Sequence, residues 1–126
     1  MATDGSPGKI GNTQVMISVA AQPHRRAGVE VESVSMAQYD VQPCNGCETC
    51  YRKTWQCPIK DGAIRLLKRM AKADGMTAGS PPYYGGVTAQ LKALTDISII
   101  PYQKREFRDK VEGALGVGGG STAARS

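Results

Sequence analysis

Four cysteines, Cys44, Cys47, Cys50 and Cys57, lie within fourteen residues of one another and give the clearest chemical signal in the sequence. Their spacing, C-x2-C-x2-C-x6-C, lets three thiolates from one short loop reach one face of a cubane cluster, and the fourth completes the coordination. Structural zinc sites more often use two C-x2-C knuckles that a longer spacer separates. The spacing therefore favours a four-iron four-sulfur cluster, with a zinc site or metal-free cysteines as the alternatives.

Two glycine-rich stretches indicate binding of an anion and of a planar ring. Residues 5–13 offer backbone N–H groups, hydroxyls and a helix N-terminus to a phosphate, but they match neither G-x-G-x-x-G nor a Walker A loop. The Pro-Pro-Tyr-Tyr-Gly-Gly run over 81–86 places aromatic and backbone groups beside a ring. On spacing alone, an ordinary capped glycine turn and a proline-tyrosine packing turn remain the alternatives.

The charge and hydropathy of the chain limit the classes of protein to which it can belong. The net charge of +5 is spread along the chain without a block of like charges, so it does not indicate nucleic-acid binding. Such diffuse charge is typical of a soluble protein and also favours acidic partners such as small ferredoxins. There is no signal peptide and no apolar run of about 18 residues, which predicts a cytoplasmic protein without a membrane span. Structural disulfides are disfavoured in that compartment.

The periodicity predicts a single domain with a parallel α/β sheet, because strands alternate with helices. In chain order we expect a helix from Asn12, a strand over 29–34, a helix over 61–71, a strand over 75–79, a helix over 87–99 and a strand over 111–117. The apolar helix faces expected are Val15, Met16, Val19 and Ala20, then Ile64, Leu67, Met70 and Ala71, then Leu91, Leu94 and Ile97. Pro23 is expected to end or kink the first helix.

The two ends of the chain predict an incomplete fold. Only residues 1–4 precede the first glycine loop, where a buried apolar strand usually stands, and the sequence stops soon after the glycines at 118–120. We therefore expect the first strand and a C-terminal helix to be missing or short, as in a fragment.

Three motifs together resemble the iron–sulfur flavoproteins of the NADPH-dependent FMN reductase superfamily. They are Ser6-Pro7 with Gly11-Asn12-Thr13, the cysteine motif followed by Ile59-Lys60-Asp61, and the run from Gly79 to Leu94. The resemblance covers nearly the whole chain. It implies a flavodoxin-like, doubly wound parallel sheet in three α/β/α layers over 1–126, with the cluster loop at 44–57. The implied cofactors are FMN and a four-iron four-sulfur cluster, in a homodimer or tetramer where the flavin of one subunit lies near the cluster of a neighbour.

The resemblance also implies roles for individual residues. The residues expected to hold the flavin phosphate are Ser6, Pro7, Asn12 and Thr13, with Lys9 nearby. The residues expected to border the isoalloxazine ring are Pro81, Tyr83, Tyr84 and Gly85, with Gly118 and Gly119 in a third loop. The expected cluster ligands are Cys44, Cys47, Cys50 and Cys57. The family commonly has arginine where this chain has Gly8.

The sequence shows no Ser-His-Asp set, acid dyad or histidine metal site, and we expect the one histidine, His24, on the surface. The chemistry is therefore expected to reside in the cofactors. The function that the resemblance implies is electron transfer from a ferredoxin-like donor through the cluster to FMN. The alternatives are an NAD(P)H-dependent FMN or quinone reductase without a functional cluster, and a non-enzymatic zinc-binding module.

Overall fold

The computed structural model describes residues 1–8, 10–53 and 55–119 of the chain. Their strands, β1 (Ala2–Asp4), β2 (Ser33–Ser35), β3 (Gly75–Ser80) and β4 (Val111–Gly116), form one sheet in the order β2-β1-β3-β4. All three strand pairings are parallel. The predicted parallel α/β sheet is therefore confirmed, and its order places the first strand in the interior of the sheet.

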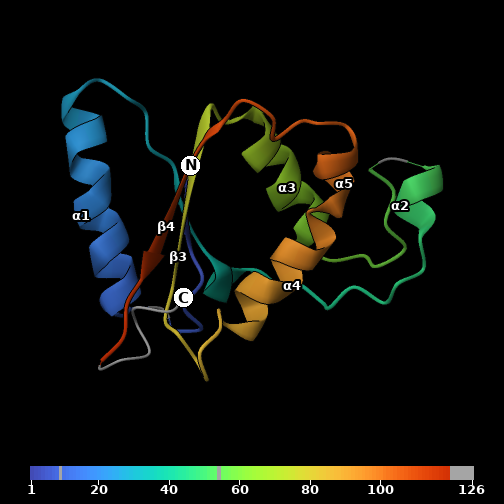
Figure 1. The fold of residues 1–126 in the computed structure, drawn as a ribbon, viewed down its shortest axis with the longest axis horizontal. Helices are drawn as coiled ribbons and strands as arrows, with labels where there is room; N and C mark the ends of the chain where they lie inside the picture. Colours follow the sequence, from blue (N-terminus) through green and yellow to red (C-terminus); the bar gives the residue numbers. More distant parts are fainter. Residues whose placement is uncertain (9, 54, 120–126) are drawn as a thin grey trace.

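Helices lie on both faces of this sheet (Figure 1). The helices are α1 (Asn12–Arg26), the 3-10 turn η1 (Met36–Gln38), α2 (Thr49–Arg52), α3 (Ala63–Lys72), α4 (Ala89–Ile97) and α5 (Ile99–Gln103). Figure 1 shows α1 on one side of the sheet and α3, α4 and α5 on the other, which gives the three layers expected. No helix in the described ranges is long and apolar enough to cross a membrane.

The first strand, expected to be missing or short, is present with three buried residues. It is bonded on both sides, since the Ala2 N–H donates to the Glu32 carbonyl at 2.8 Å and the Gly5 N–H donates to the Gly79 carbonyl at 2.7 Å. These bonds fix the start of the glycine-rich loop that follows. The expectation that a C-terminal helix is missing or short concerns the chain beyond Gly119, where residues 120–126 lie outside the described residues.

The short first strand also explains an error in the second. The alternation over 29–34 predicts a strand there, but β2 begins only at Ser33, and Val29 is half exposed. A parallel strand needs a neighbour to bond with. Three-residue β1 pairs with residues 33–35 alone, so the preceding residues remain irregular despite their alternating pattern.

The apolar face predicted for the first helix is wrong. Thr13, Ile17 and Ala21 are the buried residues of α1, whereas the side chains of Val15 and Val19 are 59% and 57% exposed. The side of α1 that meets the sheet is the one with Thr13 and Ile17: a Cβ added at Gly79 of β3 would stand 3.0 Å from Thr13 Cγ2 and 2.8 Å from Ile17 Cδ1.

Pro23 does not end the first helix, which continues to Arg26. Proline removes one N–H and so forfeits one bond to the preceding turn. Here that loss falls in an exposed segment near the end of α1. His24, in the same exposed turn, lies on the surface as predicted.

The main core lies on the other face of the sheet, between it and α3, α4 and α5. Its buried members are Val34, Met36, Ala63, Leu66, Leu67, Leu91, Leu94, Ile97 and Ile100. The face predicted for α4 is confirmed by Leu91, Leu94 and Ile97. The face predicted for α3 is only partly right, because Ala63 and Leu66 are buried with Leu67 while Ile64 and Met70 are partly exposed.

Candidate functional site

The loops that carry the predicted flavin residues leave the sheet at one edge. From β1 the chain passes through α1 to β2 on one side, and β3 lies on the other side of β1. In doubly wound sheets this reversal of strand order opens a crevice at the carboxyl ends of the strands, where ligands bind. The loops after β1, β3 and β4 all start at this edge because the strands are parallel.

Hydrogen bonds join the loops after β1 and β3. The Thr88 hydroxyl donates to the Gly5 carbonyl at 2.5 Å, and the Thr88 N–H donates to Ser80 Oγ at 3.0 Å. Thr88 is 1% exposed and also caps α4, where its Oγ1 accepts from the Leu91 N–H at 3.3 Å. The predicted site residues did not include Thr88, although a threonine directly before an apolar helical run is a recognised N-cap signal.

The predicted phosphate loop is folded on its own polar atoms. The Ser6 N–H donates to Asp4 Oδ1 at 2.9 Å, and the Gly8 N–H donates to Ser6 Oγ at 3.2 Å. Ser6 is buried, while Pro7 is exposed. Asp4 is 3% exposed, and within the described residues its Oδ2 has no hydrogen-bond partner.

The start of α1 leaves its first N–H groups open. Asn12 and Thr13 are the expected N-caps, but Gly11 takes that position, and among the described residues no side chain caps the first turn. Uncapped N–H groups and the helix dipole attract an anion. Asn12 is exposed here, whereas Thr13 is buried with its methyl group against Gly79. Lys9 lies outside the described residues.

The run after β3 ends in a tight hairpin that exposes its tyrosines. Tyr83 and Gly86 form an antiparallel bridge, and the Gly86 N–H donates to the Tyr83 carbonyl at 3.1 Å. Tyr84 and Gly85 between them have φ angles of 52° and 78°, which defines a type I′ turn. The side chains of Tyr83 and Tyr84 are free to contact a ligand, while Pro81 is partly buried.

The third glycine loop lies beside the second. The Val117 N–H donates to the Ser80 carbonyl at 3.2 Å, just before Pro81. Gly118 and Gly119 follow and are exposed. The structure thus brings the residues predicted around the flavin to one edge of the sheet, with the exception of the undescribed Lys9.

The four cysteines lie elsewhere, around α2 on the outer side of α5 (Figure 1). Cys44 and Cys47 are exposed, and Cys50 and Cys57 are partly buried against the core. Over residues 1–8, 10–53 and 55–119, no three His, Cys, Asp or Glu side chains converge on a point that would hold a metal ion. The thiols therefore share a loop without forming a preassembled metal centre.

One of these thiols has an altered acidity. The Cys47 thiol donates to Thr49 Oγ1 at 3.4 Å, and hydrogen bonding with this hydroxyl, which can donate to the thiolate once it forms, lowers the pKa of the thiol. The Thr49 backbone N–H acts in the same direction. A lower pKa enlarges the thiolate fraction, which is the form that binds metals and reacts with electrophiles.

Asp61 links the two ends of the cysteine loop through hydrogen bonds. Its Oδ2 accepts from the Gln42 N–H at 2.8 Å and its Oδ1 from the Ala63 N–H at 2.9 Å, so one carboxylate joins the loop entrance to the start of α3. Trp55 provides a second attachment, since its Nε1 donates to Glu106 Oε1 at 3.0 Å. Both ends of the loop are held while the segment with Cys44 and Cys47 stands in solvent.

This sequence is similar to a family profile and to several curated relatives. The profile described as NADPH-dependent FMN reductase matches residues 2–126. An iron–sulfur flavoprotein of Methanocaldococcus jannaschii is 42% identical over 90% of this chain and 58% of its own length. An iron–sulfur flavoprotein of Archaeoglobus fulgidus is 33% identical over 100% of this chain and 64% of its own length. One of Methanosarcina thermophila is 35% identical over 91% of this chain and 60% of its own length. The chain therefore spans less than two thirds of these relatives.

Solved structures confirm the fold. A flavone reductase superposes with a TM-score of 0.74 at 20% identity, over 99% of this chain and 45% of that chain. An NADH:FMN oxidoreductase in its apo form gives a TM-score of 0.65 at 21% identity, over 98% of this chain and 59% of that chain. At such identities the likeness concerns the fold alone. The flavodoxin-like fold and the family resemblance expected from the motifs are both confirmed.

Proposed function

The chain belongs to the NADPH-dependent FMN reductase family, and we propose that it acts as an iron–sulfur flavoprotein that transfers electrons from a ferredoxin-like donor. The observation that carries this proposal is the meeting of three glycine-rich loops at one sheet edge, joined by the bonds of Gly5 and Thr88. Matches to relatives named iron–sulfur flavoproteins support it.

The sheet edge fits FMN in the chemistry of its groups. The open N-terminus of α1 offers N–H donors to the phosphate, whereas the N–H groups of Gly5, Ser6 and Gly8 are already bonded within the protein. Tyr83 and Tyr84 offer aromatic faces to the ring. Glycine at position 5 lets the loop after β1 approach β3, because a Cβ there would meet the Gly79 carbonyl oxygen at 2.9 Å, and glycine at position 79 lets α1 approach β3, because a Cβ there would meet Ile17 Cδ1 at 2.8 Å. Bound FMN supplies one- and two-electron redox chemistry.

The cysteine loop fits iron in its donor set, which is four thiols on one segment. We propose that the exposed part of the loop closes around the cluster while Asp61 holds its base. Gly46 and Glu48, with φ angles of 70° and 57°, lie between the first cysteines and mark where the backbone already turns sharply. The position of the loop away from the sheet edge favours a homodimer or tetramer in which each cluster faces the flavin of a neighbour.

Anaerobic purification with quantification of iron and FMN tests this function. We expect about four iron atoms and one FMN per chain and broad absorbance near 400 nm, as thiolate-ligated iron gives. Reduction of the purified protein by a reduced ferredoxin completes the test. A protein that binds no iron under anaerobic reconstitution would refute the cluster assignment.

A second candidate is an NAD(P)H-dependent FMN or quinone reductase without a cluster. The description of the matching family as NADPH-dependent FMN reductase favours it. This reading predicts a yellow protein without iron that oxidises NAD(P)H when FMN is present. A colourless protein with one bound zinc would instead indicate a zinc-binding module.

A further inference from the structure

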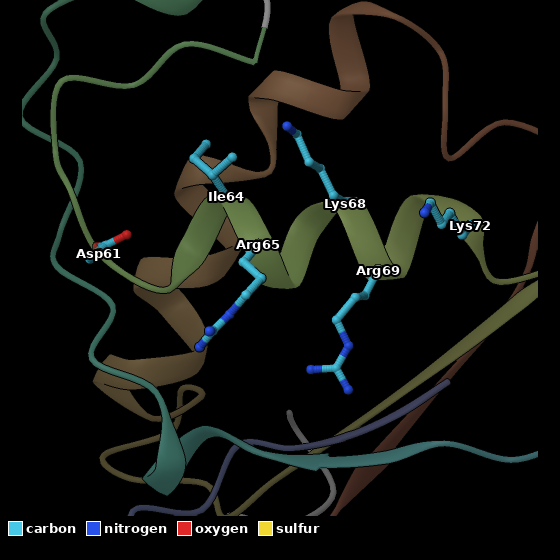
Figure 2. A pocket seen from close by; sticks show the side chains of 6 residues that line it. All are labelled: Asp61, Ile64, Arg65, Lys68, Arg69 and Lys72. Atoms are coloured by element: carbon cyan, nitrogen blue, oxygen red, sulfur yellow. The ribbon is translucent and has the colours of Figure 1, made fainter.

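One face of α3 carries a row of cations. Arg65, Lys68, Arg69 and Lys72 recur at the spacing that places side chains on the same side of a helix. Together with Asp61 and Ile64 they line a groove of about 510 Å³ (Figure 2). Asp61 is the one acidic side chain among these lining residues, and both its oxygens already accept backbone N–H groups. The groove therefore presents an excess of positive charge to solvent.

This charge is largely uncompensated within the described chain. Arg69 pairs with Glu32 and also donates to the Tyr39 hydroxyl. The other three cations are exposed, and no carboxylate of the described residues lies within 4.0 Å of them. Like charges three and four residues apart oppose helix formation by a few tenths of a kcal/mol per pair, roughly 0.2–0.5. An anionic partner would relieve that repulsion.

The groove is connected to the cysteine loop. Arg65 lies 5.6 Å from the ring centroid of Tyr39, just before the loop, and Lys68 lies 5.7 Å from that of Trp55, within it. Cation–π contacts of this kind modestly stabilise the position of the cation. The oriented charges thus border the loop that carries the proposed cluster ligands.

We propose that this groove on α3 is the docking surface for an acidic electron-donor protein, which it places beside the cysteine loop. The proposal rests on the electron-transfer function proposed above, which it extends by locating the donor and stating its chemistry. Electrostatic steering by such a row of charges raises association rates and weakens as salt is added.

The shape of the charged row favours a protein over a phosphate group. A phosphate is held by donors that converge on it, often including backbone N–H groups. The four cations instead extend over about 10 Å of helix, and Figure 2 shows Lys68 directed away from Arg65 and Arg69. The row matches several separated carboxylates better than one compact anion.

Lys72→Glu tests the proposal, with Arg26→Glu as the matched control. Each residue is a cation in the last turn of its helix, and α1 lies on the opposite side of the sheet from α3 (Figure 1). The measurement is the anaerobic rate at which a reduced acidic ferredoxin reduces the protein loaded with iron and FMN, followed at increasing salt. Photoreduced deazaflavin, a neutral reductant, checks that the cofactors remain reducible in each variant.

We expect Lys72→Glu to lower the ferredoxin rate about fivefold at low ionic strength and Arg26→Glu by less than about twofold, with the difference lost at about 1 M salt. Equal effects of the two variants would overturn the docking surface, and so would an unchanged rate in Lys72→Glu. A raised KM for NADPH with an unchanged ferredoxin rate would assign the groove to a nucleotide phosphate instead. A wild-type protein that ferredoxin cannot reduce at any salt would refute the proposed function itself.

Discussion

Alanine at position 5 should destabilise the protein through steric conflict alone. The Cβ would stand 2.9 Å from both the Gly79 carbonyl oxygen and Leu91 Cδ2, about 0.5 Å inside the 3.4 Å at which ordinary contact begins. The carbonyl is backbone of β3 and cannot rotate away. Retreat of the loop would stretch the Gly5–Gly79 hydrogen bond from 2.7 Å. Overpacking of this kind costs about 1–3 kcal/mol of unfolding free energy.

Thermal unfolding followed by circular dichroism measures this cost. For a chain of this length we expect the Tm to fall by roughly 4–12 °C. Gly8→Ala is the matched control, because it lies in the same loop but its nearest neighbour, Ser6 Oγ, is 3.7 Å from the new Cβ. Both variants lose the same chain entropy in the unfolded state, which alone would stabilise by about 0.4–1 kcal/mol. Equal Tm values for the two variants would refute the close approach of the loops after β1 and β3.

Four further variants test the rest of the site. Gly8→Arg should tighten FMN binding by roughly 10- to 150-fold in a fluorescence titration, because a charge-assisted bond to the phosphate contributes about 1.5–3 kcal/mol; weaker binding would place the phosphate elsewhere. Thr88→Val should cost about 1–2 kcal/mol in urea unfolding by removing the bond to Gly5 and the α4 cap, whereas Thr88→Ser should largely retain stability. Cys47→Ser should abolish iron binding in anaerobic reconstitution, and full iron content would remove this residue from the ligand set. Thr49→Val should shift iodoacetamide alkylation of metal-free Cys47 to higher pH, because the hydrogen bond that lowers its pKa is lost; an unchanged profile would discount that bond.

The sequence predicts the elements with regular local patterns better than those set by their neighbours. The predicted α4 carries Leu91, Leu94 and Ile97 in phase, and the structure buries all three. In contrast, the buried side of α1 depends on which face of the helix meets Gly79. That contact joins segments far apart in the chain, so helical periodicity alone selected the exposed Val15 and Val19.

The same distinction applies to the candidate site. The glycine loops after β1, β3 and β4 were recognised by composition, and parallel pairing brings them to one edge. The contact of Thr88 with Gly5 joins residues 83 apart and carries no local signature beyond an N-cap. The hydrogen bond from the Gln42 N–H to Asp61 likewise forms only when the cysteine loop between them brings its two ends together.

These long-range bonds imply that the two predicted cofactor regions differ in rigidity. The flavin edge is built on sheet bonds and on buried Thr88, so its loops are preorganised before any ligand arrives. The cysteine loop is fixed at Asp61 and Trp55, but Cys44 and Cys47 remain in solvent. A preorganised site loses little conformational entropy on binding, whereas a loop that must close spends part of its binding free energy on ordering. FMN retention should therefore track the stability of the fold, and cluster retention should depend on the thiol ligands themselves.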